Sequence, residues 1–417
     1  MIKTLQGGMR TGAVAIPASK SFAHRILICA ALSDEASTVS CDGISKDIAA
    51  TMKCLSALGA NFEQKDGNTI LVTPGRPDGP ETRHMYCGES GSTLRFLLPL
   101  SAALGADVEF HMEGLLSKRP HKELIEQLEL HGVRICQEGD ILKCKGQLAP
   151  GEYVIPGGVS SQFISGLLFA LPLLAGESRI RIVGRMESAA YVTMTEQAIK
   201  KAGITFVREG DTYIVPGNQR YHVSAALTVE RDWSNAAFFL CLGGLSEKGV
   251  LVRGMDPESS QGDRKIIDVI RGFGASVEYT NGDYLVKKGN MVPQVIDASE
   301  IPDLVPVISV FALGAVGDTK IVNAARLRFK ESDRLQSTAA LINALGGKAE
   351  ETEDGLVIHG TGALRDGTVD PVNDHRIAMA AAVAASLCDG TVTVTDAECV
   401  QKSYPAFWDD FGSMEVM

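Results

Sequence analysis

The stretch LELHGVRI, residues Leu128 to Ile135, contains the pattern that decides the fold: the end of a helix, a glycine and a short strand. The same pattern occurs five more times. The six glycines follow one another at intervals of 66 to 73 residues and are Gly59, Gly132, Gly203, Gly274, Gly346 and Gly412. Glycine suits this position because the residue that ends a helix often adopts a left-handed conformation. We infer six copies of one α/β unit of about 72 residues.

A second strand is expected after five of the six copies, because each continues into a hairpin signal. These signals read DGNTILV, EGDILKC, EGDTYIV, NGDYLVK and EDGLVIH, and their Asp-Gly, Gly-Asp or Asn-Gly pairs favour tight turns. The last copy ends without this strand, so the N-terminal strand of the chain is expected to complete the C-terminal part.

Six units are too many for one core, so the sequence predicts an α/β fold of two similar lobes. Each lobe consists of three repeated units around buried helices. We expect residues 19–229 to form the N-terminal lobe, and residues 1–18 together with 230–417 to form the C-terminal lobe. The active site is expected in the cleft between the lobes, because ligands usually bind between domains.

Composition excludes several classes of protein. The 417 residues carry a net charge of −11, which argues against binding to nucleic acid or to an anionic membrane. The nine cysteines lack C-x-x-C or zinc spacing, which predicts reduced thiols, a cytoplasmic protein and no metal. The longest apolar stretches, 164–176 and 378–388, are too short to span a membrane and are expected to be buried helices.

Three predicted helix starts carry groups that suit an anion. Lys20 and Ser21 lie at a strand-to-helix junction, Cys87 to Pro99 form a Gly/Ser-rich turn, and Ser160 to Gln162 open a very apolar helix. Helix N-termini offer free N–H groups and a positive dipole end to phosphate or carboxylate. An ordinary N-cap with a solvated lysine explains the first stretch equally well, and a plain turn explains the second.

Two further stretches place charge at helix starts. In RLRFKESDRLQS, residues 326–337, a helix from about Ser332 would bring Lys330, Glu331 and Arg334 together, although a solvated charge run also explains the pattern. The run from Asp374 to Arg376 begins a nearly all-apolar helix, where charged side chains do not serve solubility.

Taken together, these motifs resemble the EPSP synthase family of enolpyruvyl transferases. The resemblance covers essentially the whole chain. Its most specific pieces are P-x-S-K-S-x-x-x-R at Pro17–Arg25, R-P at Arg119–Pro120, S-S-Q at Ser160–Gln162, I-P-D at Ile301–Asp303, K-E-S-D-R at Lys330–Arg334 and N-D-H-R at Asn373–Arg376. The family fold has two lobes of three α/β units and closes on its ligands.

The resemblance implies a reaction of the shikimate pathway, which leads to chorismate and the aromatic amino acids. The enolpyruvyl group of phosphoenolpyruvate is transferred to the 5-hydroxyl of shikimate 3-phosphate, giving 5-enolpyruvylshikimate 3-phosphate and phosphate. No metal or organic cofactor is implied. The expected partners are these two substrates, with neither nucleic acid nor membrane, and the protein is expected to be a cytoplasmic monomer.

The resemblance also assigns residues. Phosphoenolpyruvate would be held by Lys20, Gly91, Arg119, Gln162, Arg334, Arg376 and Lys402. Shikimate 3-phosphate would be held by Lys20, Ser21, Arg25, Ser160, Ser161, Gln162, Ser188, Tyr191, Asp303 and Lys330. Such cations and N–H dipoles suit substrates that each carry a phosphate and a carboxylate. The catalytic groups would be Asp303 as base, Glu331 as proton donor to carbon, and Lys20 as a helper.

The sequence departs from the family pattern at four positions: His24, Glu89, Phe96 and Arg326. These differences bear on substrate affinity and inhibitor sensitivity, while the reaction class is unaffected. Glu89 is the most unusual, because a carboxylate beside the phosphoenolpyruvate pocket is repulsive unless a cation pairs with it.

Three alternative functions fit the sequence less well. The sister enzyme that uses UDP-N-acetylglucosamine commonly has a cysteine five residues before the arginine of its R-P loop, where this chain has Gly114. A cyclase of RNA ends with a related repeated fold is disfavoured by the net charge of −11. A non-catalytic phosphoanion-binding protein would gain nothing from the carboxylates of Asp303 and Glu331.

Overall fold

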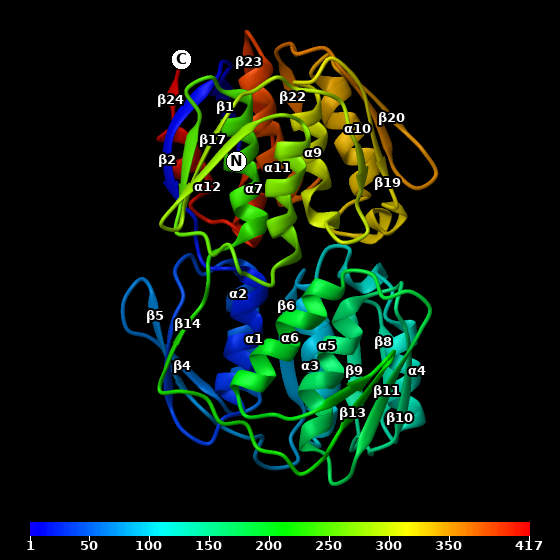
Figure 1. Ribbon diagram of the computed structural model, residues 1–417. Helices are drawn as coiled ribbons and strands as arrows, with labels where there is room; N and C mark the ends of the chain where they lie inside the picture. The colour runs from blue at the N-terminus through cyan, green and yellow to red at the C-terminus, as the bar shows by residue number, and fades with distance from the viewer. The chain divides into compact units, whose positions relative to one another are not determined.

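The computed structural model describes residues 1–417 and contains two compact units (Figure 1). One unit is Ala18–Val229, and the other combines Met1–Pro17 with Glu230–Met417. The chain therefore passes between the units twice. The first passage falls after Pro17 and the second after Val229.

The unit Ala18–Val229 contains three four-stranded sheets with one shared topology. In each sheet two parallel strands are followed by an antiparallel hairpin. The strands, in sheet order, are β14 (Ala226–Thr228), β3 (Ser37–Ser40), β5 (Thr69–Thr73) and β4 (Asn61–Gln64); β6 (Arg83–Gly88), β7 (Val108–Met112), β9 (Ile141–Lys145) and β8 (Arg134–Glu138); β10 (Glu152–Pro156), β11 (Ser178–Val183), β13 (Thr212–Val215) and β12 (Val207–Glu209). The three sheets confirm the predicted repeat.

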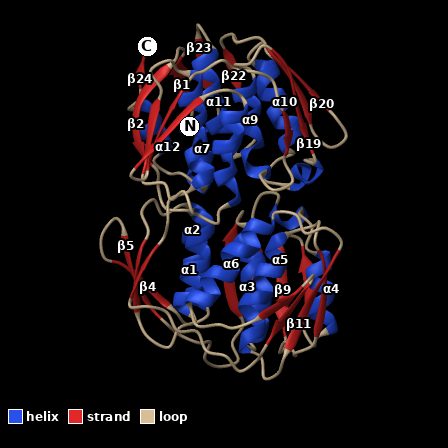
Figure 2. Ribbon diagram, in the orientation of Figure 1, coloured by secondary structure: helices blue, strands red, loops and turns tan.

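The helices of this unit stand between its sheets, as Figure 2 shows. They are α1 (Lys20–Ala31), α2 (Lys46–Ala57), α3 (Gly91–Ala103), α4 (Lys122–Leu130), α5 (Ser161–Ala170) and α6 (Ala189–Lys201). Helices α3 and α5 pack along each other and are almost wholly buried. Their apolar sequences follow from this position, since a helix that is surrounded by protein needs no polar face.

In the other unit two sheets have the same topology, one of them extended by a fifth strand, and the third sheet has three strands. The strands of this unit, in sheet order, are β16 (Ser276–Thr280), β17 (Asp283–Lys287), β15 (Val250–Arg253), β2 (Arg10–Ala15) and β24 (Glu415–Val416); β18 (Val295–Asp297), β19 (Gly317–Val322), β21 (Leu356–Gly360) and β20 (Lys348–Glu351); β1 (Lys3–Gln6), β23 (Thr391–Val394) and β22 (Gly367–Val369). Its helices are α7 (Trp233–Leu245), α8 (Ile266–Gly272), α9 (Val305–Ala312), α10 (Arg334–Ala344), α11 (His375–Ala384) and α12 (Phe407–Gly412).

Short 3₁₀ segments complete both units. They are Leu116–Lys118, Leu171–Leu173, Gly262–Lys265, Pro302–Leu304, Ala325–Phe329, Ala385–Leu387 and Ala397–Lys402. The two apolar stretches predicted to be buried helices form α5 and α11 with the 3₁₀ turns that follow them. No helix is both long enough and apolar enough to cross a membrane.

The first strands of two repeats are exchanged along the chain. Strand β2 precedes α1 in sequence but pairs in parallel with β15, whereas β14 precedes α7 but pairs in parallel with β3. Strand β1 pairs antiparallel with β23, which is the place of the missing strand in the sixth repeat. The sheets of the unit Ala18–Val229 are completed by β14 at its C-terminal end, whereas those of the other unit are completed by β1 and β2 from residues 1–17.

Five of the six repeat glycines adopt the left-handed conformation that was expected of a helix end. Their φ angles are 102° at Gly59, 96° at Gly132, 80° at Gly203, 98° at Gly274 and 72° at Gly346. The prediction for Gly412 is wrong, because this residue is the last of α12 and does not have positive φ. The chain there continues through Ser413, whose conformation is right-handed, into β24.

Two of these glycines give a matched test of the repeat. A Cβ atom at Gly274 would lie 2.2 Å from the carbonyl oxygen of Asn290, whereas one at Gly203 would meet nothing closer than 3.9 Å. We expect Gly203→Ala to lower the free energy of unfolding by about 1–2 kcal/mol through backbone conformation alone. Gly274→Ala should lower it further because the backbone of Asn290 must move. Urea unfolding of both variants measures the difference, and equal losses would contradict the close approach.

Candidate functional site

Serine side chains fix the helix starts at which the sequence placed anion-binding groups. In the unit Ala18–Val229, Ser19, Ser90 and Ser160 cap α1, α3 and α5 by accepting hydrogen bonds from backbone N–H groups in the first turn. The predicted residues Lys20, Gly91 and Ser161 therefore begin these helices. Such caps leave other N–H groups of the first turn available to an anion.

Arg25 is buried and forms hydrogen bonds with other residues that are predicted to bind shikimate 3-phosphate. Its guanidinium donates to the backbone oxygens of Ser21 and Tyr191 at 2.6 and 2.7 Å, and to Thr195 Oγ1 at 2.8 Å. Burial lowers the pKa of Arg25 to about 10. Ser188, with φ of 54°, immediately precedes α6, and its carbonyl accepts from the Tyr191 N–H. The structure thus brings together Ser21, Arg25, Ser188 and Tyr191.

A second group surrounds Gln162. Arg95 Nη1 donates to Gln162 Oε1 at 2.7 Å, and Gln162 Nε2 donates to Ser92 Oγ at 2.9 Å. The guanidinium of Arg119 lies against Gly91, since a Cβ atom there would be 3.1 Å from Arg119 Nη1. The predicted residues Gly91, Arg119 and Gln162 therefore share one place with Arg95. Lys20 forms an ion pair with Asp47 at 2.8 Å.

Two of the unusual residues pack on this framework. His24 is fully buried, with Nδ1 2.7 Å from Thr51 Oγ1, and its pKa is well below the usual range because of burial and the nearby charges of Lys20 and Arg25. The ring of Phe96 contacts His24 edge-on, and the Arg25 guanidinium lies 5.1 Å above the centre of the Phe96 ring.

In the other unit, Arg334 is the centre of an ion-pair cluster at the start of α10. Its guanidinium contacts Asp303 at 2.7 Å, Glu331 at 2.6 Å and Asp374 at 2.8 Å. The side chain is 1% exposed, and Asp374 is not exposed at all. These three carboxylates raise the pKa of Arg334 despite its burial. Helix α10 begins two residues later than the sequence suggested, with Asp333 as its N-cap.

Asp303 links this cluster to two further cations. Its carboxylate lies 3.2 Å from Arg376 Nη2 and 3.6 Å from Lys330 Nζ. Burial lowers the pKa of Lys330 to about 8, partly offset by the charge of Asp303. Lys402 donates to the backbone oxygen of Asn373 at 2.6 Å, directly before α11. The structure therefore gathers the predicted residues of this unit around the starts of α10 and α11.

Sequence reasoning missed three charged residues that support these groups, Asp47, Arg95 and Asp263, and it noticed Asp374 without giving it a role. Arg95 lies inside the quoted stretch Cys87 to Pro99, and its position in an apolar helix was a signal that could have singled it out. Asp263 is buried and accepts a hydrogen bond from Ser234. Its pKa is raised to about 7 by burial and by the charge of Asp303, with Arg376 opposing the shift. No sequence pattern marks Asp263.

Comparison with known sequences decides the family. A sequence model of the family described as EPSP synthase (3-phosphoshikimate 1-carboxyvinyltransferase) matches residues 6–411. The chain belongs to the EPSP synthase family. The 3-phosphoshikimate 1-carboxyvinyltransferase of Clostridium kluyveri is 42% identical over 409 residues, covering 97% of this chain and 95% of the relative. That of Clostridium acetobutylicum is 43% identical over 405 residues, covering 96% and 94%.

Solved structures agree with this assignment at the level of the fold. EPSP synthase from Acinetobacter baumannii matches with a TM-score of 0.79 and 24% identity, covering 100% of this chain and 99% of that one. The enolpyruvyl transferase NikO from Streptomyces tendae matches with a TM-score of 0.80 and 17% identity, covering 100% and 98%. The resemblance to the EPSP synthase family and the predicted fold class are therefore both confirmed.

Proposed function

We infer that this protein is a 3-phosphoshikimate 1-carboxyvinyltransferase. It transfers the enolpyruvyl group of phosphoenolpyruvate to the 5-hydroxyl of shikimate 3-phosphate and releases phosphate, in the pathway to the aromatic amino acids. The observation that carries the inference is the cluster in which Arg334 holds Asp303 and Glu331 together beside Arg376. It places two carboxyl groups able to exchange protons among cations able to bind phosphate.

The residues that we propose for each substrate include members of both units. Shikimate 3-phosphate uses the group organised by Arg25 and the Ser160–Gln162 turn, together with Asp303 and Lys330. Phosphoenolpyruvate uses Lys20 and the group around Gln162, together with the cations of the other unit, which are Arg334, Arg376 and Lys402. The support is the local geometry, because each part of each set is already gathered at helix starts within its own unit.

The chemistry needs a base and an acid. Asp303 takes the proton of the 5-hydroxyl as its oxygen bonds to the central carbon of phosphoenolpyruvate, and Glu331 supplies a proton to the methylene carbon, with Lys20 assisting. The tetrahedral adduct then loses phosphate, which leaves with the proton that Asp303 had taken, and the new methyl group returns a proton to Glu331. A single group that acts first as acid and then as base is common in general acid–base catalysis.

Substrate anions replace protein carboxylates in this scheme. Arg334 contacts three carboxylates, and Lys20 contacts Asp47. An incoming phosphate or carboxylate competes for the same cations, because Arg forms paired hydrogen bonds with either group. Displacement of Glu331 from Arg334 would free it to carry a proton to carbon.

The surroundings of Gly114 argue against the sister reaction with UDP-N-acetylglucosamine, because a cysteine does not fit at this position. This residue has φ of 58°, and a Cβ atom there would lie 2.7 Å from Glu89 Oε2. A cysteine at this position would therefore need both a left-handed backbone and displacement of Glu89. Here the Glu89 side chain occupies the space that a residue at position 114 would use.

Phosphate release tests the proposed function. The purified protein should release phosphate from phosphoenolpyruvate only when shikimate 3-phosphate is also present. Release with UDP-N-acetylglucosamine in its place would refute the assignment, and release from phosphoenolpyruvate alone would indicate a phosphatase. We also propose a cytoplasmic monomer, a location supported by nine free cysteines of which eight are buried.

Lys330 makes binding of shikimate 3-phosphate depend on pH. Its pKa of about 8 means that the ammonium is present at pH 7 and is lost as the pH rises through 8. Asp303, Arg334, Arg326 and Glu331 contribute the other charges around it. The substrate phosphate is fully ionised above about pH 7. We expect affinity to fall by up to about tenfold between pH 7 and 9, measured by calorimetry.

Lys330→Arg is the matched control, because a guanidinium remains charged throughout this range. Its affinity should vary much less with pH than that of the unchanged protein. The same loss of affinity in both proteins would remove Lys330 as the group responsible.

A further inference from the structure

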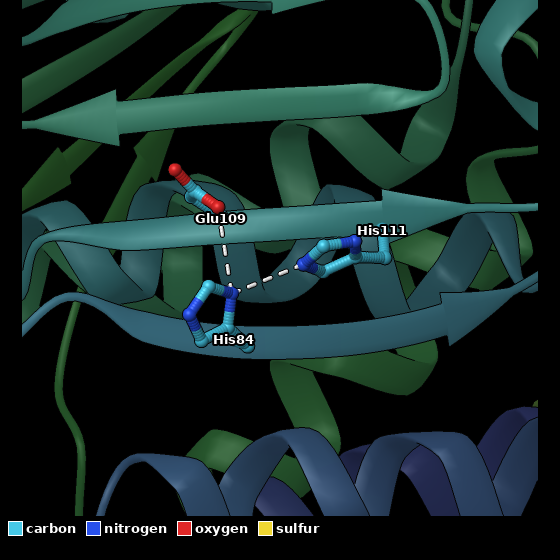
Figure 3. A group of neighbouring side chains, drawn as sticks. All are labelled: His84, Glu109 and His111. Carbon is cyan, nitrogen blue, oxygen red and sulfur yellow. Dashed lines mark hydrogen bonds and ion pairs between the residues drawn. The ribbon is translucent and has the colours of Figure 1, made fainter.

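A cluster of metal-ligating side chains lies on the outer face of the sheet β6-β7-β9-β8. It consists of His84 on β6 with Glu109 and His111 on β7, and Figure 3 shows the three side chains turned toward one another. Strands β6 and β7 are parallel, with His84 opposite Glu109. Their neighbours Met85 and Phe110 point to the core and are fully buried. Alternation along the strands therefore places all three polar groups on the same outer face.

The contacts converge on one atom. His84 Nδ1 lies 3.2 Å from His111 Nε2 and 3.4 Å from Glu109 Oε2, and the three atoms all lie within 4.8 Å of one another. If His84 Nδ1 carries a proton, it donates well to only one of the two neighbours, and if it carries none, it can accept from His111 but not from the carboxylate of Glu109. Three ligand atoms around one cation are a better account of this convergence.

We propose that His84, Glu109 and His111 form a binding site for a divalent transition metal of the zinc class. Zinc binds histidine nitrogen at about 2.0–2.1 Å and carboxylate oxygen at about 2.0–2.2 Å, with tetrahedral geometry. Two ligands of such a tetrahedron are about 3.3 Å apart, close to the two separations seen here. Two imidazoles and one carboxylate also select zinc, nickel or copper over magnesium and calcium, which prefer oxygen ligands.

The surroundings support a site that is partly open to solvent. The side chains of His84 and Glu109 are 54% and 25% exposed, which leaves room for water as a fourth ligand. The ring of Tyr86 stacks on that of His111 with 4.6 Å between ring centres, which orients the imidazole. Lys143, the strand neighbour of Glu109 on β9, has its own partner in Glu138 at 2.7 Å.

The contacts of His359 show how a surface ion-pair network differs from a metal site. In the other unit, His359 contacts Asp318 through Nδ1 and Glu350 through Nε2. Opposite sides of one ring cannot face a single ion, so that arrangement is a surface ion-pair network. Only the group of His84, Glu109 and His111 brings three ligand atoms within 4.8 Å of one another.

The proposed metal is outside the reaction. None of its three ligands belongs to the proposed substrate sets, and the site lies on the face of the sheet opposite the buried core. We expect the metal to stabilise the sheet that contains β6 and β7, because binding to the folded state alone raises stability by mass action.

Zinc titration of the full chain tests the site. Calorimetry with Zn²⁺, after treatment of the protein with a chelator, should show one equivalent bound. His84→Gln and His111→Gln should each weaken this binding at least tenfold, with phosphate release unchanged in the absence of metal. Unaltered zinc binding in both variants would overturn the proposal, as would the absence of any binding to the unchanged protein.

Two control variants exclude other ligands. His222→Gln removes an exposed histidine of the same unit, and Cys136→Ser removes the one exposed cysteine, which lies on β8 of the same sheet. Both should bind zinc as the unchanged protein does, and loss of binding in either would assign the metal elsewhere. Cobalt(II) gives a second readout, because four-coordinate cobalt absorbs visible light strongly and should lose this band in His84→Gln.

Discussion

Replacement of Asp303 by asparagine should lower kcat by about 10²- to 10⁴-fold while the affinity for both substrates changes little. The amide keeps the size of the carboxyl group and can still accept a hydrogen bond from Arg334, but it cannot take the proton of the 5-hydroxyl. Asp303→Ala should likewise lose turnover and retain binding. Steady-state rates of phosphate release and calorimetric binding of shikimate 3-phosphate measure the two effects separately.

Asp268→Asn is the matched control for this experiment. Asp268 belongs to the same unit and lies exposed on α8, so its neutralisation should leave kcat unchanged. A kcat for Asp303→Asn within a few-fold of the unchanged protein would remove Asp303 as the base. A large loss of affinity with normal kcat would make it a binding residue only.

Replacement of Arg334 by alanine should destabilise the protein more than any other single change in the cluster. The side chain is 1% exposed and contacts three carboxylates, one of them fully buried. Its removal leaves Asp303, Glu331 and Asp374 close together without their shared cation. Breaking a buried ion pair by removing one partner costs about 3–5 kcal/mol. Urea unfolding should show this loss, and activity should be abolished.

Arg328→Ala provides a matched comparison on the surface. Arg328 also contacts two carboxylates, those of Asp333 at 3.0 Å and Glu351 at 2.8 Å, but it is 29% exposed. Water screens such pairs, so its removal should cost no more than about 1 kcal/mol. Similar losses of stability in the two variants would contradict the role given to burial. Arg334→Lys should recover only part of the lost stability, because an ammonium lacks the planar set of N–H donors with which the guanidinium contacts three carboxylates.

Local patterns made much of this structure predictable. The left-handed glycines and hairpin signals identified the repeat, because both depend on a few neighbouring residues. The exception is Gly412, where the chain ends in a short strand beside β2 and needs no left-handed turn. The starts of α1, α3, α5 and α11 were also predictable, since each begins with polar residues directly before an apolar run.

Features that depend on tertiary contacts could not be predicted in this way. Asp374 was noticed as a charged residue at a helix start, but its contact with Arg334 joins positions forty residues apart in the chain. The cluster of His84 with Glu109 and His111 has no metal-binding spacing in sequence, because its ligands are brought together by the register of two strands. The spacing of ligands along one segment does not reveal ligands that lie on neighbouring strands.

The exchanged strands impose an order on folding during synthesis. The unit Ala18–Val229 is one uninterrupted segment, so it has all of its strands once β14 has left the ribosome. Strands β1 and β2 are made first, yet their partners β23 and β15 begin only at Thr391 and Val250. Strand β2 therefore has no partner until β15 has been translated, and β1 has none until β23 has been translated. A chaperone that shields these strands would protect the nascent protein during the interval in which it is most prone to aggregate.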